Sequence, residues 1–222
     1  FYKVPDNIPD NVVAGANCGI SQMLYAMEGA GVKPNDFVVV QGMGGLGLYT
    51  SAICDVMGAN VIAVDAVDDR LEEAKAFGAK YTIDMKQFPT KEERYAEITK
   101  ITGKKGPDIV VDVAGVPSAF DEAVRMAKIG GTIVEIGNVS IEESQCTSVI
   151  PGLIVRKCLT IKGVLRYQPY YLYRTLQFLA RYHDTYPFDS LTDKCYSLEE
   201  TQEALQKAAN KEVKRAIIEP NQ

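Results

Sequence analysis

The sequence predicts an α/β fold built on a doubly wound, parallel sheet of six strands. Three observations lead to this prediction: short apolar runs alternate with helical segments over residues 37–164, the connections are short, and a glycine-rich turn follows the first run. Strands of a parallel sheet are covered on both faces, so they are nearly continuous in Val, Ile and other apolar residues. Partial segments of a second unit are expected at both ends.

The strands are expected where the apolar runs lie, at Phe37–Gln41, Asn60–Val64, Lys80–Ile83, Ile109–Asp112, Thr132–Ile136 and Leu159–Val164. The helices between them are expected at Leu46–Met57, Asp68–Phe77, Lys91–Ile101 and Ser118–Ala127. A glycine follows each helix as a C-terminal stop: Gly58, Gly78, Gly103 and Gly130. Six strands with helical crossovers are the expected number for a complete dinucleotide-binding fold.

The two ends of the chain are expected to differ from this core. Residues 1–21 are too rich in Pro and Asn for regular structure, and a helix is expected from Ser21 to Ala30. After Val164 the alternation stops, and the sequence predicts helices at Tyr170–Tyr182 and Ser197–Ala209 and a strand at Lys214–Glu219. Ser197 is the expected N-cap of the second helix, with Glu200 as its capping-box partner.

The turn after the first strand has the Gly-x-Gly-x-x-Gly spacing, with Gly42, Gly44 and Gly47. Gly42 would allow a tight turn, Gly44 would let a pyrophosphate approach the backbone, and Gly47 would let the helix pack close to the sheet. The helix N-terminus would then present free N–H groups to the phosphates. Together with the strand before it, this motif predicts a Rossmann fold.

Asp65 ends the second strand, 18 residues after Gly47. A carboxylate there accepts hydrogen bonds from the adenine-ribose hydroxyls of NAD and repels the 2′-phosphate of NADP. The sequence therefore predicts NAD as the cofactor. Arg70 is the one residue that could weaken this preference, because it could pair with a 2′-phosphate.

Composition excludes several other classes of protein. The net charge is −5 without a basic cluster, which argues against a nucleic-acid partner. The apolar runs are far shorter than the roughly 20 residues of a membrane span, and no signal peptide is visible. Five cysteines without a C-x-x-C pair, and one histidine, argue against a disulfide framework and a His-rich metal site. A cytoplasmic location is expected.

Several motifs in order resemble the zinc-dependent alcohol dehydrogenases of the medium-chain dehydrogenase/reductase superfamily. The resemblance covers nearly all 222 residues. It rests on these motifs: Asn17-Cys18-Gly19, the segment Val40–Gly47, Val64-Asp65 with Arg70 and Ala74-Lys75, Phe77-Gly78-Ala79, Gly106-Pro107-Asp108 leading into Val111–Gly115, Gly130-Gly131, and Ile136-Gly137.

The resemblance implies a two-domain enzyme of which this chain is a part. Residues 1–21 would belong to the catalytic domain, 22–164 would form the NAD-binding domain, and 165–222 would return to the catalytic domain. The N-terminal catalytic half would be missing, along with two zinc ligands and the structural zinc lobe, so the chain would be an excised or truncated piece. Cys18 stands where the family has the third protein ligand of the catalytic zinc, although a small buried thiol is the alternative.

The implied reaction is hydride transfer between a small alcohol or polyol and NAD, with zinc bound only in the full-length enzyme; this chain alone would be inactive. Arg215 matches a basic position that reaches the pyrophosphate in some members of the resembled family, although an edge-strand surface charge is equally compatible. The expected cofactor-binding residues are Gly42, Gly44, Gly45, Leu46, Gly47, Asp65, Arg70, Ala114, Gly115, Ile136, Gly137, Leu165, Arg166 and Arg215.

Three alternatives remain at this point. The first is a zinc-free quinone or enoyl reductase of the same superfamily, which Asp65 disfavours because those enzymes usually prefer NADP. The second is an NAD-binding module without chemistry. The third is a methyltransferase, which the glycine spacing and the long sequence after the fifth strand disfavour. Members of the resembled family usually pair through an edge strand, so a homodimer or homotetramer through Thr160–Leu165 is expected, without a nucleic-acid or membrane partner.

Overall fold

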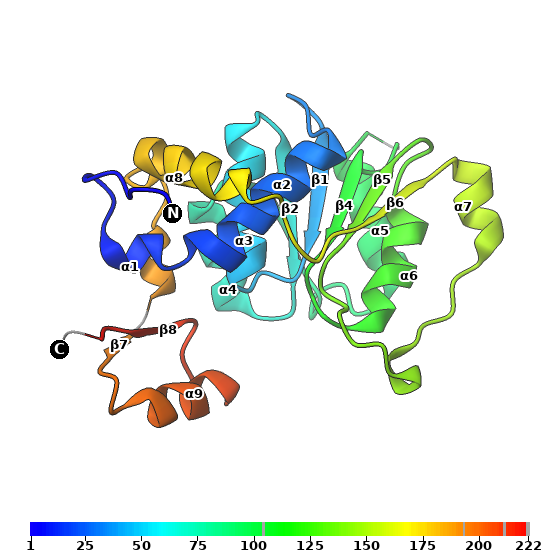
Figure 1. The fold of residues 1–222 in the computed structure, drawn as a ribbon. Coiled ribbons are helices and arrows are strands. Elements are labelled where there is room, and N and C mark those ends of the chain that lie inside the picture. Colours follow the sequence, from blue (N-terminus) through cyan, green and yellow to red (C-terminus); the bar gives the residue numbers. More distant parts are fainter. Residues whose placement is uncertain (104, 193, 211, 221–222) are drawn as a thin grey trace.

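The fold is centred on one parallel sheet, seen in a computed structural model that describes residues 1–103, 105–192, 194–210 and 212–220. Within these residues the sheet has six strands in the order β3-β2-β1-β4-β5-β6, and all its neighbours pair in parallel (Figure 1). Its strands are β1 (Phe37–Gln41), β2 (Asn60–Asp65), β3 (Ala79–Asp84), β4 (Ile109–Asp112), β5 (Thr132–Glu135) and β6 (Thr160–Gly163). The strand order reverses between β1 and β4, which is where ligands bind in open α/β sheets.

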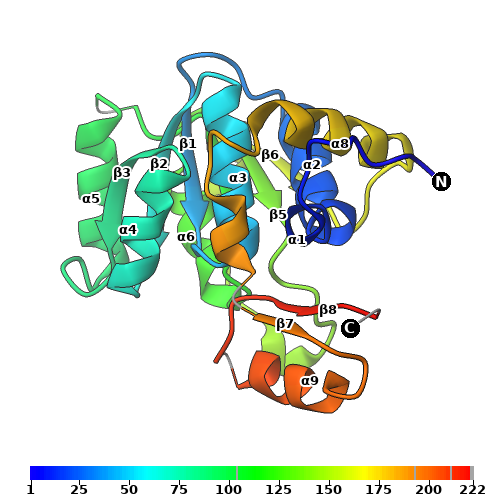
Figure 2. The same cartoon turned by 90° about the vertical axis from the view of Figure 1, so that its left-hand side faces the viewer.

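Helices cover both faces of the sheet. One face packs against α2 (Ser21–Ala30), α3 (Gly45–Val56), α4 (Asp68–Ala76) and α8 (Tyr170–Tyr182). The other face packs against α5 (Lys91–Ile101), α6 (Pro117–Met126) and α7 (Pro151–Lys157). Figure 2 shows the remaining C-terminal elements as a separate small layer below the sheet: β7 (Lys194–Tyr196), α9 (Thr201–Ala209) and β8 (Ala216–Ile218).

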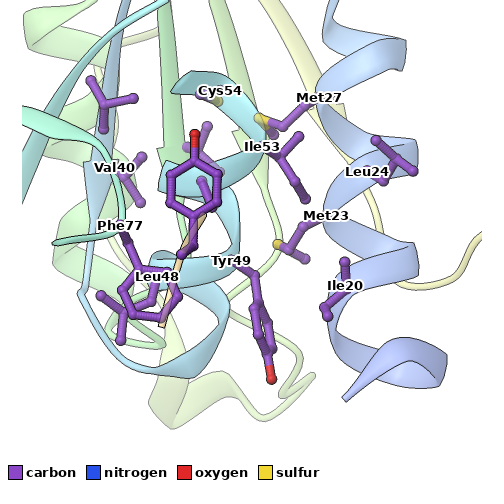
Figure 3. Close-up of a cluster of buried hydrophobic side chains, with 14 of the residues drawn as sticks. Ile20, Met23, Leu24, Met27, Val40, Leu48, Tyr49, Ile53, Cys54 and Phe77 are labelled. Carbon is purple, nitrogen blue, oxygen red and sulfur yellow. The ribbon is translucent and has the colours of Figure 1, made fainter. Parts of the chain in front are cut away.

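The core residues of the strands explain why the sheet forms. In β1, Val38 and Val40 belong to the cluster on one face and Val39 to the cluster on the other, and all three are fully buried. Figure 3 shows the larger cluster, where α3 lies against α2, with Met23 and Met27 facing Ile53. Burying an aliphatic side chain of this kind stabilises a fold by about 1.5–3 kcal/mol.

The predicted α/β fold and most of its elements are confirmed. All six strands and the four helices between them are present, and their ends differ from the prediction by one residue at most. The four glycines that were expected to end helices all have positive φ. Strand β6 departs from the expected burial, because it lies at the edge of the sheet and leaves Ile161 41% exposed.

The expectation that residues 1–21 lack regular structure is wrong. This segment forms α1 (Asp10–Val13) and the π-helical turn η1 (Ala16–Ile20), which runs directly into α2. Ile8, Val12, Ala16 and Ile20 recur every four residues and are all buried. This helical spacing of apolar residues outweighs the local preference of Pro and Asn for turns.

The expected start of the last helix at Ser197 is also wrong, because α9 begins at Thr201. The Glu200 carboxylate does accept a hydrogen bond from the Ser197 N–H at 2.9 Å, which is half of the expected capping box. Residues 197–201 form tight turns in which Glu200 N–H donates to the Ser197 carbonyl and Thr201 N–H donates to the Leu198 carbonyl. The first hydrogen bond of helix α9 therefore forms one turn later than predicted.

Three side-chain contacts attach the C-terminal segment to the helices of the sheet. The Tyr186 hydroxyl donates to Asp55 on α3 at 2.8 Å. Glu73 on α4 accepts hydrogen bonds from Ser190 at 3.1 Å and from Lys214 at 2.7 Å. The segment is therefore held against helices α3 and α4. Among the residues described, no helix is long and apolar enough to cross a membrane.

Candidate functional site

A cavity of about 1020 Å³ lies at the carboxyl ends of β1, β2 and β4, where the strand order reverses. Its walls come from the glycine turn, from the loop after β2, from the first turns of α5 and α6, and from the C-terminal segment. The residues that matter most for its chemistry are Gly42, Gly44, Gly45, Asp65, Arg70, Glu73, Lys91, Arg94, Ala114, Asp121, Glu122 and Lys214. The volume lies at the upper limit of the range typical of small-molecule sites.

The glycine turn has little space at two of its positions. Gly42 has φ +94°, and a Cβ there would lie 2.8 Å from the Cα of Ala114. A Cβ at Gly47 would overlap the carbonyl oxygen of Gly42. Helix α3 can therefore start directly under the turn, with Gly44 as its N-cap and without a capping side chain. The free N–H groups of its first turn face the cavity and favour an anion.

Asp65 lines the same cavity, and its carboxylate is 7% exposed. It accepts hydrogen bonds from the backbone N–H groups of Met43 at 2.6 Å, Ala66 at 2.7 Å and Val67 at 3.0 Å. The guanidinium of Arg70 lies 3.8 Å from the same carboxylate. Asp65 therefore ties the glycine turn to the end of β2.

The basic side chains that line the cavity each face a carboxylate. Lys91 lies 2.8 Å from Asp121, and Lys214 lies 2.7 Å from Glu73. The Arg94 guanidinium makes two hydrogen bonds of 2.7 Å to Glu122 and also donates to the carbonyls of Phe88 and Pro89. The hydrogen bonds to Glu122 raise the pKa of Arg94. The cavity wall therefore carries many charged side chains, and each of these positive charges is balanced by a neighbouring carboxylate.

A pair of carboxyl groups, one buried and one half-buried, lies at the ends of β4 and β5. Asp112 is fully buried and is the register partner of Glu135. Burial and the nearby Glu135 raise the pKa of Asp112 to about 7. The Asn138 amide donates to both carboxylates, at 3.2 Å and 3.0 Å. The Ala114 N–H donates to Asp112 at 2.9 Å, so this pair supports the loop that closes one side of the cavity.

The structure brings together six of the residues predicted to bind the cofactor. Gly42, Gly44, Gly45, Asp65, Arg70 and Ala114 all line the cavity. The other eight lie outside the cavity wall: Leu46, Gly47, Gly115, Ile136, Gly137, Leu165, Arg166 and Arg215. Of these, Gly115 and Gly137 pack against each other, whereas Leu165 is 63% exposed.

Comparison with known proteins agrees with this geometry. Residues 45–181, more than half of the chain, match the family model of zinc-binding dehydrogenases. The chain belongs to the zinc-binding dehydrogenase family. It is 32% identical over 208 residues to 5-exo-hydroxycamphor dehydrogenase of Pseudomonas putida, covering 93% of this chain and 57% of that protein.

Further relatives also match most of this chain. D-xylulose reductase of Saccharomyces cerevisiae is 33% identical over 168 residues, covering 75% of this chain and 46% of that protein. The crystal structure of an alcohol dehydrogenase from Thermotoga maritima superposes with a TM-score of 0.91 at 26% identity, covering 99% of this chain and 60% of that one. The chain therefore spans about half to three fifths of the length of these relatives.

The chain has few Cys and His side chains that could act as zinc ligands. Cys18 is exposed on η1, and all five cysteines are free thiols. No cluster of three or more His, Cys, Asp or Glu side chains that could hold a metal ion occurs in the described parts of the chain. A catalytic zinc site takes three protein ligands. The side chains of the described residues do not make up such a site.

Sequence reasoning missed the far wall of the cavity. Lys91, Arg94, Asp121 and Glu122 come from α5 and α6 and meet only in the folded chain. No short motif contains them. Asp112 lies in the motif segment Val111–Gly115 and Glu135 in the predicted strand Thr132–Ile136, but their proximity depends on the pairing of β4 with β5.

The raised pKa of Asp112 should make the stability of the folded chain depend on pH. Asp112 keeps its proton up to about pH 7 in the folded state, but only up to about pH 4 in the unfolded state. The protonated side chain therefore contributes its full stability to the fold below about pH 4. That contribution is lost as the pH rises through 7. Asp112→Asn resembles the protonated form, so it should raise the melting temperature at pH 8 by at least about 5 °C, and clearly less at pH 5.

Thermal melts by circular dichroism at the two pH values measure this difference. Glu199→Gln is the matched control, because Glu199 is exposed, and it should change the melting temperature equally little at both. An Asp112→Asn variant that is destabilised equally at pH 5 and pH 8 would show that Asp112 is ionised in the folded protein.

Proposed function

We propose that this chain is the cofactor-binding part of an NAD-dependent, zinc-type alcohol or polyol dehydrogenase. The observation that carries the proposal is the meeting of the glycine turn, the N-terminus of α3 and Asp65 in one cavity at the point where the strand order reverses. The relatives named as an alcohol dehydrogenase and as 5-exo-hydroxycamphor dehydrogenase support the reaction class. Because the chain spans little more than half of them, the activity is proposed for the longer protein.

The chain's own residues would hold the cofactor in an extended pose. The N–H groups of Gly44, Gly45 and Leu46 would bind the pyrophosphate, and Asp65 would accept from the ribose hydroxyls. The loops after β4 and β5, with Gly115 and Gly137, would direct the nicotinamide toward Leu165 and Arg166. Bound NAD supplies the hydride acceptor. The residues of this chain would supply the orientation of the cofactor and the charged groups around it.

Ribose recognition would require an exchange of hydrogen bonds at Asp65. A carboxylate accepts about four hydrogen bonds, and Asp65 already accepts three from the backbone. A ribose diol donates two. The Met43 N–H would therefore be released when the ribose binds, so the glycine turn would adjust on binding.

The parts of the chain outside the sheet would belong to the catalytic unit of the longer protein. We assign residues 1–21 and 165–222 to that unit and residues 22–164 to the NAD-binding domain. We also propose a cytoplasmic location and assembly through the β6 edge, where Ile161 is 41% and Leu165 63% exposed. Sedimentation equilibrium of the chain tests the assembly, and a monomer at all concentrations would contradict it.

The chain as given should neither hold zinc tightly nor oxidise alcohols. Of the expected ligands only Cys18 is present, and one thiolate does not replace a three-ligand site with its supporting partners. Metal analysis of dialysed protein and a panel of alcohols and polyols with NAD measure both properties. Stoichiometric zinc, or clear turnover by the chain alone, would contradict this account.

The direct test of the proposed function is binding of NADH to this chain, followed by the same alcohol panel with the longer protein. The chain has no tryptophan, so the emission of bound NADH is measured without interference from indole. Saturable NADH binding by the chain, with alcohol-dependent NADH formation by the longer protein, is expected. An NADH-binding chain whose longer form reduces only quinones or enoyl compounds would favour the zinc-free alternative.

A further inference from the structure

Arg215 lies beside the cavity and stacks on an aromatic ring. Its guanidinium carbon lies 5.5 Å from the centre of the Tyr49 ring, within the range of a cation–π interaction. Tyr49 is the fifth residue of α3 and is 2% exposed. Arg215 directly follows Val213 and Lys214, which line the cavity. The stack therefore joins the residue just before the C-terminal strand β8 to the helix that starts at the glycine turn.

The lead-in segment closes this contact from a third side. A Cβ at Gly19 would lie 2.9 Å from the Tyr49 ring and 3.3 Å from an Nη atom of Arg215. A Cβ at Gly15 would overlap the Tyr49 hydroxyl and lie 3.5 Å from the other Nη atom of Arg215. Both glycines thus let η1 pack directly on the stacked pair. Figure 3 shows Tyr49 at the end of the α2–α3 interface where Ile20 lies, with its hydroxyl directed away from the buried cluster.

Arg215 differs from the basic residues of the cavity wall in its charge balance. Arg70, Lys91, Arg94 and Lys214 each face a carboxylate within 4 Å. Among the residues that the structure describes, no carboxylate lies within 4 Å of Arg215. A half-buried guanidinium that is stacked but not neutralised is suited to an anion.

The position of the stack also indicates which anion. Tyr49 follows Gly45 by four residues, so both lie on the same face of α3, one turn or about 6 Å apart along the helix. The free N–H groups of the α3 N-terminus therefore lie one helical turn from the residue on whose ring Arg215 stacks. Two such positive groups fit the two linked phosphates of a dinucleotide.

We infer that Tyr49 is a positioning residue that holds Arg215 as a cation for the pyrophosphate of the cofactor. This inference rests on the proposed function. Tyr49 touches no part of the cofactor and acts through Arg215. The aromatic ring is the necessary part, and the hydroxyl is not. Burial raises the pKa of that hydroxyl, which keeps Tyr49 neutral and preserves the ring as a platform for the cation.

The test compares two competitors of NADH, ADP-ribose, which carries the pyrophosphate, and adenosine, which lacks it. Tyr49→Leu should weaken ADP-ribose binding by about tenfold, the effect of losing one charge-assisted hydrogen bond. It should change adenosine binding by less than twofold. Tyr49→Phe keeps the ring and should bind both competitors like the parent. Melting temperatures of all variants are measured in parallel.

A double-mutant cycle with Arg215→Gln shows whether Tyr49 acts through the arginine. Arg215→Gln should weaken ADP-ribose about as much as Tyr49→Leu or more, and the double variant should bind no more weakly than Arg215→Gln alone. Additive losses, an equal loss for adenosine, or no loss in Tyr49→Leu would each overturn the inference. A parent chain that binds neither NADH nor ADP-ribose would instead refute the proposed function itself, and this inference with it.

Discussion

Replacing Gly44 with valine should abolish NADH binding while leaving the fold intact. A Cβ at Gly44 meets no atom within 4 Å, and the residue has ordinary extended dihedral angles as the N-cap of α3. The new side chain would therefore fill the space in front of the free N–H groups, where the pyrophosphate is expected. We expect a loss of affinity of at least about 100-fold, which corresponds to roughly 2.7 kcal/mol.

Fluorescence titration with NADH, together with a thermal melt, measures both parts of this expectation. Gly152→Val is the matched control, because a Cβ at Gly152 also meets open space, but on α7 and away from the cavity. It should keep the parent affinity. If Gly44→Val binds NADH as well as Gly152→Val does, the pyrophosphate does not lie at this turn.

Removing the carboxylate of Glu122 should destabilise the protein by about 3–5 kcal/mol, because Glu122→Ala leaves the charge of Arg94 buried without its partner. The two side chains are only 10% and 7% exposed and share two hydrogen bonds of 2.7 Å. For a chain of this size the melting temperature should fall by roughly 10 °C.

Denaturant unfolding of Glu122→Ala and Glu72→Ala compares the loss of a carboxylate from a buried ion pair with its loss from an exposed one. Glu72 pairs with Lys75 on the surface of α4, with side chains 71% and 52% exposed, so its loss should cost less than about 1 kcal/mol. The double variant Arg94→Met/Glu122→Leu should recover part of the stability lost in Glu122→Ala. Equal effects of Glu122→Ala and Glu72→Ala would show that the Arg94–Glu122 pair is solvated.

The sheet could be predicted from the sequence because its signals are local. Continuous apolar runs such as Phe37–Gln41, and glycines after each helix, mark strands and helix ends without reference to the rest of the chain. Helix α7 was missed because Pro151-Gly152 suggests a turn, whereas Leu153 and Ile154 pack against the second core cluster. Strand β7 has three residues and depends on pairing with β8, which no local pattern predicts.

The candidate site also has one part that could be predicted from the sequence and another that could not. The glycine turn and Asp65 belong to one βαβ unit with fixed spacing, so their meeting could be predicted. The partners of the basic residues could not, because Lys91 meets Asp121, and Lys214 meets Glu73, across long sequence separations. The stack of Arg215 on Tyr49 likewise joins residues 166 positions apart.

Competitive titration of the chain with NADH and NADPH tests the central claim most directly. The Asp65 carboxylate faces the cavity and keeps the hydrogen bonds from the backbone N–H groups of Ala66 and Val67, so it has little freedom to turn away from a 2′-phosphate. Repulsion and the lost ribose hydrogen bonds should be worth ~2–3 kcal/mol, so NADH should bind about 30–150 times more tightly than NADPH. Equal or tighter binding of NADPH, or no binding of either, would contradict the assignment of this chain as the NAD-binding part of a dehydrogenase.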